Sequence, residues 1–245
     1  MTSPTLRTGS SGIHVVALQI RLNQHLSPGT VLNCDGKFGP LTQSAVMAFQ
    51  RLRRLSCDGV VGPMTWGALD QGKPALVMVD HNRSKIAQPT QSTCWAASTA
   101  VMKGSTVQQV VQQTPANMVA SDGGLLNGSD TNDGVQRGRA YGQVHGLNCH
   151  APMSWTTGGL MGLLRRSPVM FDMLWSVGGY TSGLGSPGHM VVVSAAVSDG
   201  NPNGGTTVLR VLDPWPPNQG KDSWVEYGAW MREVPTRTYR LFDLR

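Results

Sequence analysis

Cys94, His189 and Asp213 have side chains suited to nucleophilic catalysis and stand where structural elements are predicted to begin or end. Cys94 opens the stretch "CWAASTAVM", whose small and apolar residues predict a buried helix. His189 opens an apolar run rich in valine, and Asp213 closes the next such run, just before Pro214. A thiolate can attack a carbonyl carbon, an imidazole can carry the proton, and a carboxylate can orient the imidazole. We therefore predict a nucleophilic Cys94, a basic His189 and an orienting Asp213.

The predicted elements can bring these three side chains together. Ser92 and Thr93 are typical N-cap residues, so the Cys94 sulfur should lie in the first helical turn, where the helix dipole favours a thiolate. The stretch "SDGNPNGG" predicts a hairpin loop between the two β-rich runs. Such a hairpin would place His189 beside Asp213 on adjacent antiparallel strands.

A glutamine amide upstream of Cys94 can hold the oxyanion that forms when sulfur attacks a carbonyl group. Gln88 lies six residues before Cys94, on a loop that can fold back so that its side-chain amide donates to this oxyanion. Gln91 is nearer in the sequence and is the alternative donor.

Two other kinds of site fit the sequence less well. Cys149 and His150 are adjacent, and neighbouring side chains of a strand point to opposite faces. Zinc-binding spacings such as Cys-x2-Cys or His-Glu-x-x-His do not occur in the sequence. We therefore expect no metal and no cofactor.

The stretch from Gln88 to Asp213 resembles the papain-like cysteine peptidases. The glutamine, the Cys-Trp-Ala sequence six residues later, the Gly-His at a strand start and the Asp at the end of the next strand recur there in this order. The spacing and the Asp-Pro-Trp ending are similar to compact bacterial effector proteases of this type, in which Asp replaces the Asn of plant and lysosomal enzymes. The resemblance covers residues 77–240. It implies a helical lobe with Cys94, an antiparallel β lobe with His189 and Asp213, and a cleft for an extended peptide.

An internal repeat organises the first part of the chain. "NCDGKFGPLTQ" from Asn33 and "SCDGVVGPMTW" from Ser56 share the pattern C-D-G-x-x-G-P-x-T with an offset of 23 residues. In each copy, Asp-Gly predicts a tight turn and Pro predicts the first position of a helix. An apolar stripe formed by Val15, Leu18 and Leu22 precedes the repeat. Together these patterns predict three short helices joined by two equivalent loops.

This unit, from about residue 6 to residue 70, resembles the peptidoglycan-binding domain that is attached to bacterial and phage cell-wall hydrolases. The resemblance implies binding to peptidoglycan, and the first candidates for contact with the glycan are Asp35, Phe38, Asp58 and Trp66. Asp35 and Asp58 can equally be turn formers. From the repeat alone, a structural or dimerisation module is the alternative.

Cys34 and Cys57 occupy the same position in the two copies of the repeat. Equivalent loops of so small a unit can lie side by side and bring the two α-carbons within the ~4.4–6.8 Å that a disulfide requires. We therefore predict a Cys34–Cys57 disulfide, which would indicate an oxidising compartment. The alternative is that both cysteines are ordinary small hydrophobic residues in a reducing compartment.

The composition restricts the fold and the partners. The chain has 245 residues, of which only 14% are charged and 30 are glycine, as in globular domains rich in loops and buried strands. We predict an α+β fold, with a small three-helix domain at residues 1–72 and a papain-like domain at residues 73–245. The net charge is +6, but no stretch of the sequence forms a block of like charges. Nucleic acid is therefore not an expected partner.

The sequence also bears on where the protein acts. The first residues, "MTSPTLRTGSSG", lack the basic start and apolar core of a secretory signal. No run of about 18 apolar residues, the length that can span a bilayer, occurs either, so no membrane partner is expected. We expect export without a signal peptide, by a secretion machine or by lysis, and action at the bacterial cell wall or in the periplasm.

Together these features predict a cell-wall-directed cysteine hydrolase. It would be an amidase or endopeptidase that cuts peptidoglycan stem peptides, as an exported antibacterial effector or a lysin. The expected partners are peptidoglycan and an immunity or inhibitor protein, and a monomer is the default. One alternative is a cysteine protease that acts on proteins and uses the helical module for export or anchoring. The other is a wall-binding protein with an inactive papain fold.

Overall fold

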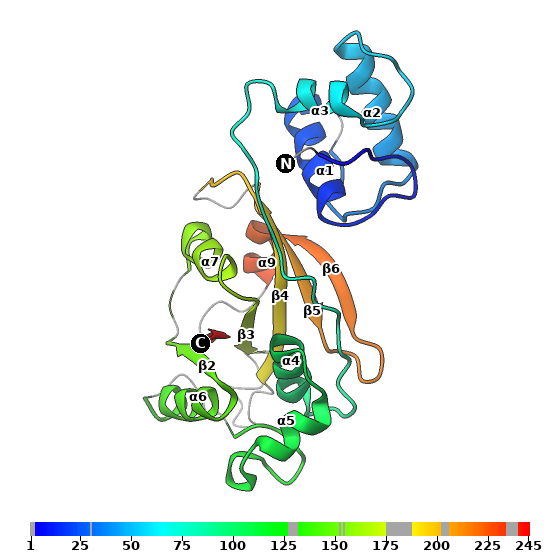
Figure 1. Ribbon diagram of the computed structural model, residues 1–245. Coiled ribbons are helices and arrows are strands. Elements are labelled where there is room, and N and C mark those ends of the chain that lie inside the picture. The colour runs from blue at the N-terminus through cyan, green and yellow to red at the C-terminus, as the bar shows by residue number, and fades with distance from the viewer. Residues whose placement is uncertain are drawn as a thin grey trace.

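The computed structural model describes residues 3–29, 31–126, 132–151, 153, 155–174, 188–201, 206–233 and 240–245. Its helices are α1 (Ile13–Leu26), α2 (Pro40–Leu52), α3 (Pro63–Asp70), α4 (Cys94–Lys103), α5 (Val107–Gln113), α6 (Asn132–His145), α7 (Thr157–Leu164) and α9 (Tyr227–Glu233), with a short 3-10 turn at Ala116–Met118. Its strands are β1 (Val77–Asp80), β2 (Leu147–His150), β3 (Val169–Leu174), β4 (Gly188–Ser198), β5 (Val208–Asp213), β6 (Lys221–Glu226) and β7 (Arg240–Leu244). The predicted α+β fold is confirmed: a helical N-terminal unit is followed by an antiparallel sheet with helices (Figure 1).

The two copies of the repeat form equivalent loop-to-helix units at α2 and α3. Gly39 and Gly62 precede these helices with nearly identical backbone angles, φ −95° and ψ −171° at Gly39 and φ −96° and ψ −171° at Gly62. Pro40 and Pro63 begin the helices without loss of a hydrogen bond, because the first N–H of a helix has no acceptor within it. The three helices bury a common core of leucine, valine and aromatic side chains.

A buried glutamine closes each repeat loop. Gln19 Nε2 donates to Asp35 Oδ1 at 2.9 Å, and Gly36 N donates to Gln19 Oε1 at 3.0 Å. Gln50 makes the matching contact in the second copy, where its Nε2 donates to Asp58 Oδ1 at 2.8 Å. Both glutamines are almost fully buried, so these hydrogen bonds compensate for the loss of water. The first loop is therefore tied to α1 and the second to α2.

The predicted disulfide is not formed, and Cys34 and Cys57 are both free thiols. Cys34 is buried where α1 meets the sheet, and this burial raises the pKa of its thiol to about 12. Cys57 is exposed, and its sulfur lies 3.4 Å from the carbonyl oxygen of Met47. Equivalence in the repeat does not bring the two cysteines together, because one loop folds onto α1 and the other onto α2. The pair therefore gives no indication of an oxidising compartment.

Among the described residues, β4 lies inside a seven-stranded antiparallel sheet. The strands follow the order β2-β7-β3-β4-β5-β6, and β1 pairs with the last residues of β4. β3 pairs with the first half of β4, whereas β5 pairs with the stretch from Val192 to Val197. The pairing of β4 with β5 confirms the predicted antiparallel arrangement, although residues 202–205 of the connecting loop lie outside the described residues.

Helices cover both faces of the sheet, which explains why β4 is buried at nearly every position. Met190 and Val192 pack with side chains from α4, α5 and α6, whereas Val191 and Val193 pack with side chains from α7 and α9. Successive residues of a strand point to opposite faces, so a strand buried on both faces needs a continuous apolar run. The run "MVVVSAAV" after His189 meets this need.

The helical unit contacts the end of the sheet that is remote from His189. Val197 of β4 and Val208 of β5 form one buried cluster with α1 residues, including Val16 and Ile20. Figure 1 shows α1, α2 and α3 gathered at one end of the molecule, while β4 runs away from them toward α4. No helix in the described part of the chain is both long and apolar enough to cross a membrane.

Candidate active site

Cys94 is the first residue of α4 and is nearly buried, with 7% of its surface exposed. Thr93 is the N-cap residue, yet its side chain does not cap the helix. The Thr93 hydroxyl instead accepts a hydrogen bond from Thr90 N at 3.2 Å, which folds the preceding loop toward the helix start. Backbone N–H groups of the first helical turn have no acceptor within the helix. They are available to an oxygen atom near the Cys94 sulfur.

His189 and Asp213 lie side by side at neighbouring ends of β4 and β5. His189 Nε2 lies 2.7 Å from Asp213 Oδ1, and Trp215 N donates to the same oxygen at 2.8 Å. The carboxylate acceptor places the ring proton on Nε2, so Nδ1 is the nitrogen that can take up a proton. His189 is 4% exposed, so water competes little with this contact.

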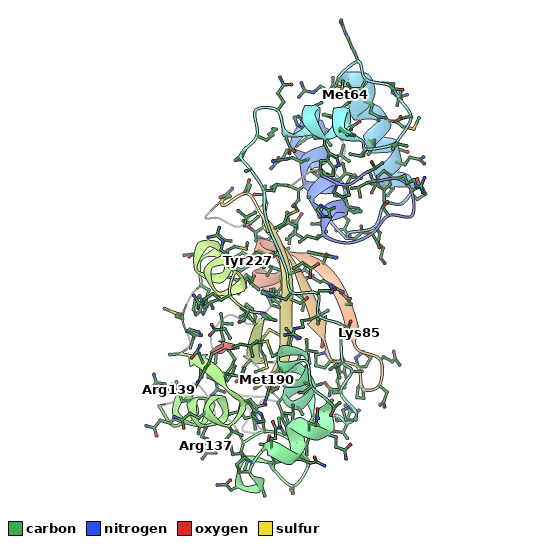
Figure 2. The ribbon with its side chains drawn as sticks, viewed as in Figure 1. Met64, Lys85, Arg137, Arg139, Met190 and Tyr227 are labelled. Atoms are coloured by element: carbon green, nitrogen blue, oxygen red, sulfur yellow. The ribbon has the colours of Figure 1, made fainter. Side chains whose placement is uncertain are left out.

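The start of β4 lies against the start of α4. Cys94 Sγ is 3.8 Å from the carbonyl oxygen of Gly188, the residue before His189. One turn further along α4, Ser98 Oγ donates to the carbonyl oxygen of Met190 at 2.7 Å, which fixes the helix against the strand. Met190 is labelled in Figure 2, beside α4. The structure therefore brings the predicted nucleophile to the strand end that carries the predicted base.

Burial is the largest influence on the pKa of Cys94. The pKa of this thiol is raised to about 11, first because burial disfavours the thiolate and also because the carboxylates of Asp172 and Asp213 are close. Hydrogen bonds with the backbone at Met190 and Trp95 favour the thiolate but do not offset the burial. These causes oppose the predicted stabilisation of the thiolate by the helix start, which stays a prediction. A raised pKa means that a base must assist the removal of the thiol proton.

A cavity of about 250 Å³ lies beside Cys94. Its walls come from the loop before α4, from the loop at residues 120–125, and from the start of β4 with the neighbouring part of β3. The described residues that line it are Gln91, Ser92, Cys94, Trp95, Ala120, Asp122, Gly124, Leu125, Asp172, Gly188 and Met190. The cavity is large enough for part of a peptide residue, and the Cys94 sulfur is within reach of what enters it.

Gln88 holds the loop before α4 and does not line the cavity. Its side-chain Nε2 donates to the carbonyl oxygens of Thr90 at 2.6 Å and of Gln91 at 3.0 Å. These two acceptors fix the orientation of the amide, since the amide oxygen could not bond to either of them. Gln88 N also donates to Pro214 O at 3.0 Å, which ties the loop to the end of β5. Gln91, the alternative oxyanion donor, lines the cavity, and the choice between the two glutamines stays a prediction.

Two protein families match the chain in the order that the motifs predicted. Residues 11–69 match a peptidoglycan-binding domain. Residues 79–230, more than half of the chain, match the family described as papain-like cysteine protease AvrRpt2. The protein belongs to this AvrRpt2 family of papain-like cysteine proteases. Its N-terminal helices form the peptidoglycan-binding domain, and the sheet with α4 belongs to the papain-like domain.

Solved structures resemble a limited part of the chain. A fused zinc-dependent amidase/peptidase with a peptidoglycan-binding domain from Clostridium acetobutylicum is 37% identical over 29% of this chain and 30% of its own, with a TM-score of 0.26. The Burkholderia AP3 phage endolysin is 40% identical over 29% of this chain and 27% of its own, with a TM-score of 0.26. The SleB N-terminal domain is 33% identical over 28% of this chain and 92% of its own, with a TM-score of 0.26. This chain thus spans less than a third of the first two proteins. Among curated proteins, none matches it significantly.

The four predicted glycan contacts of the peptidoglycan-binding domain have structural roles. Phe38 and Trp66 are buried in the helical core, at 2% and 7% exposure, and Trp66 Nε1 donates to the carbonyl oxygen of Pro4 at 2.9 Å. Asp35 and Asp58 each accept a hydrogen bond at 2.9 Å from the backbone N–H two residues later. This geometry is that of a turn former. The prediction that Phe38 and Trp66 contact the glycan is therefore corrected, because both are core residues. The two aspartates fit the alternative, in which they form turns.

Two carboxylates of the cavity, Asp122 and Asp172, were missed by the sequence reasoning. Asp172 is the only charged residue in the strand "VMFDML", and a lone charge in a buried strand is a signal for a polar site. Asp122 lies in a loop of glycine and polar residues, where nothing in the sequence distinguishes it from a turn former. Within the described ranges, no three His, Cys, Asp or Glu side chains gather as ligands for a metal ion.

Proposed function

We propose that the protein hydrolyses an amide bond in the peptide stems of peptidoglycan, with Cys94 as the nucleophile. The observation that carries the proposal is the contact of Cys94 with the start of β4, beside one cavity. His189 lies at this start of β4 and contacts Asp213 at the end of β5. This site stands in a papain-like domain that follows a peptidoglycan-binding domain. A nucleophile, a base and an orienting carboxylate are the set that amide hydrolysis through a covalent intermediate requires.

In the first half-reaction, Cys94 Sγ attacks the carbonyl carbon of the substrate amide. His189 Nδ1 accepts the thiol proton during the attack, because burial raises the pKa of the Cys94 thiol and a base must assist the loss of this proton. The Cys94 backbone N–H and the Gln91 side chain donate to the oxyanion. His189 then transfers the proton to the leaving nitrogen, the carbon–nitrogen bond breaks, and a thioester remains on Cys94.

In the second half-reaction, water attacks the thioester carbonyl. His189 Nδ1 accepts a proton from the water, and the carbon–sulfur bond breaks as the tetrahedral intermediate collapses. The sulfur recovers its proton from His189, and the shortened stem leaves with a new carboxylate. Throughout both half-reactions, the contact between His189 Nε2 and Asp213 Oδ1 holds the imidazole ring in one orientation.

The peptidoglycan-binding domain delivers the papain-like domain to its substrate. Two linked modules raise the local concentration of the second site once the first is bound, provided that both can reach the polymer. The contact of α1 with the ends of β4 and β5 supports a fixed arrangement of the two domains during this delivery. We extend the proposal to an exported antibacterial effector or a lysin, with an immunity or inhibitor protein as the partner of the producing cell.

Digestion of purified peptidoglycan tests this proposal. Wild type and Cys94→Ala are incubated with the wall, and the soluble fragments are identified by mass spectrometry. The proposal expects the loss of one stem-peptide bond with wild type and none with the variant. A wall that wild type leaves intact contradicts it.

A second candidate, a protease that acts on proteins, is favoured by the family match, whose description is that of a protease. The peptidoglycan-binding domain would then serve for export or anchoring. Casein or another unfolded protein is the discriminating substrate. Cleavage of casein through Cys94 together with an intact wall would favour this candidate.

A further inference from the structure

A second cavity, of about 450 Å³, lies where the peptidoglycan-binding domain meets the papain-like domain. The loop at residues 31–34, after α1, forms one wall, and β6 with α9 forms the other. Figure 1 shows α9 and the adjoining end of β6 on the side of the papain-like domain that faces α1. The volume lies within the ~300–1,000 Å³ that is usual for small-molecule sites.

The wall from β6 is fixed by contacts with the helical domain. A β-carbon at Gly36 would lie 2.9 Å from Trp224 Nε1, so the edge of this indole packs against the backbone of the first repeat loop. Glu226, two residues further along β6, is close enough to Cys34 that its carboxylate contributes to the raised pKa of this thiol. The two domains therefore preform the cavity between them.

Two indole rings line this cavity, Trp224 from β6 and Trp230 from α9. Trp230 packs on Phe171, with ring centroids 5.0 Å apart and an interplanar angle of 64°. Both tryptophans are held by their neighbours but remain partly exposed. The negative face of an indole attracts C–H groups, and one face of a pyranose ring presents several of them together. The cavity therefore offers rigid surfaces on which a sugar ring can pack.

Polar groups stand beside the two indoles. Asn33 and Glu226 line the cavity and are exposed, and within the described part of the chain neither side chain makes a hydrogen bond or an ion pair. An amide can donate and accept, and a carboxylate can accept, which suits the hydroxyl and acetamido groups of a sugar. Glu226 is the only charged residue of the described lining, so the cavity disfavours acidic ligands such as the stem carboxylates.

From these contacts we propose that the cavity binds N-acetylhexosamine units of the peptidoglycan glycan strand. Residues 31–34 lie within the segment that matches a peptidoglycan-binding domain, so the cavity is continuous with the part of the chain that contacts this polymer. Trp224 and Trp230 lie within the segment that matches the protease family. Both domains thus contribute to one glycan site. The inference rests on the proposed function, because it names the wall component that is held while a stem is cut.

The glycan site is separate from the catalytic residues. On β6, Glu226 pairs with Val208, whereas Lys221 pairs with Asp213. These two pairs are five residues apart on β6, a separation of ~17 Å along the strand. Sugar binding can therefore be measured without any cleavage step.

Calorimetric titration with a soluble β-linked tetramer of N-acetylglucosamine tests the site in the full chain. Trp230→Ala and Trp155→Ala form a matched pair, because both tryptophans are partly buried and pack against the same core cluster, but Trp155 does not line the cavity. We expect the Kd of the tetramer to rise about tenfold in Trp230→Ala and to stay unchanged in Trp155→Ala. Trp230→Phe keeps an aromatic face and should recover most of the affinity.

Hydrogen exchange of the wild-type protein locates the tetramer without any substitution. We expect slower exchange at residues 31–34 when the tetramer is bound, since this loop forms one wall of the cavity. Exchange that slows only in other segments overturns the inference, as do equal affinities of Trp230→Ala and Trp155→Ala. If Trp230→Ala does not fold, the exchange pattern decides.

The outcome for the inference is distinct from the outcome for the proposed function. A wall that is cut by a protein that does not bind the tetramer overturns the inference and leaves the proposed function standing. Tetramer binding in the cavity together with an intact wall has the opposite meaning, because the glycan site then exists without the proposed hydrolysis.

Discussion

Asp213 Oδ1 accepts hydrogen bonds from two partners, His189 Nε2 at 2.7 Å and Trp215 N at 2.8 Å. The backbone contact fixes the carboxylate, and the carboxylate then fixes the imidazole ring. The same oxygen thus connects the turn after β5 to the base at the start of β4. Because these contacts set the orientation of the imidazole ring, Asp213 is the residue through which the orientation of the base can be tested.

Replacement of Asp213 should lower the rate according to how well the new side chain holds the ring. We expect Asp213→Ala to reduce kcat by about 10²-fold, because the ring loses its orienting acceptor. Asp213→Asn keeps an acceptor oxygen and should reduce kcat by about tenfold or less. Steady-state cleavage of a stem peptide measures both variants, and equal activity of Asp213→Ala and wild type would contradict the assigned role.

The pH dependence of alkylation tests the state of the Cys94 thiol. Burial and nearby carboxylates raise its pKa to about 11, so the reactive thiolate grows with pH and does not level off below about pH 10. Initial rates of iodoacetamide labelling at Cys94, followed by peptide mass spectrometry between pH 5 and pH 10, give this profile. A plateau that is reached below pH 7 would show a thiolate–imidazolium pair in the resting protein instead.

The two glutamines before Cys94 should respond differently to substitution. Gln91→Ala removes the side-chain amide of a residue that lines the cavity, and we expect kcat to fall about 10²-fold without loss of fold. Gln88→Ala removes two hydrogen bonds that hold the loop, so it should lower the unfolding temperature as well as kcat. Activity and thermal unfolding of both variants decide the assignment. A large loss of kcat in Gln88→Ala at unchanged stability would return the oxyanion role to Gln88.

His145 should make the papain-like domain sensitive to acid. The side chain is 2% exposed, and burial first, with Lys103 nearby, lowers its pKa from 6.5 to about 4. The folded state therefore binds this proton less readily than the unfolded state. The corresponding stability is fully present above pH 6.5 and is lost as pH falls from 6.5 to 4, by about 1.4 kcal/mol per pH unit at most.

Urea unfolding at pH 7 and pH 5 measures this loss. In His145→Gln, which removes the titrating group, the difference in unfolding free energy between the two pH values should shrink by about 1–2 kcal/mol. His150→Gln is the control, since His150 is partly exposed and contacts Asp243 Oδ1 at 2.7 Å. An unchanged pH difference in His145→Gln would contradict a neutral, buried His145.

Local patterns of the sequence were enough to predict the elements that carry the site. The apolar run after His189 predicted a buried strand, and Asp-Pro marked the end of the next one, because both signals depend on residues close together in the chain. The repeated Gly-Pro pairs predicted the starts of α2 and α3 for the same reason. The order of Cys, His and Asp then sufficed to indicate a papain-like arrangement, which the family match confirms.

Contacts between distant segments were not predictable in the same way. The pKa of Cys94 depends on how deeply α4 is buried against β4. The residues that predict the start of a helix give no information on this depth. The prediction of a disulfide was wrong because Gln19 and Gln50 bind the two loops to different helices. Asp172 joins the cavity through its pairing with Met190 across two strands, a register that the sequence does not specify.

The central claim is that Cys94 forms a thioester with a peptidoglycan stem, and intact-mass measurement tests it most directly. Wild type and Cys94→Ala are mixed with a purified stem peptide, quenched in acid within seconds and weighed by mass spectrometry. The account predicts an added mass equal to the acyl part of the stem on wild type, mapped to Cys94 and absent from the variant. Cleavage of the stem by Cys94→Ala at the wild-type rate would contradict it.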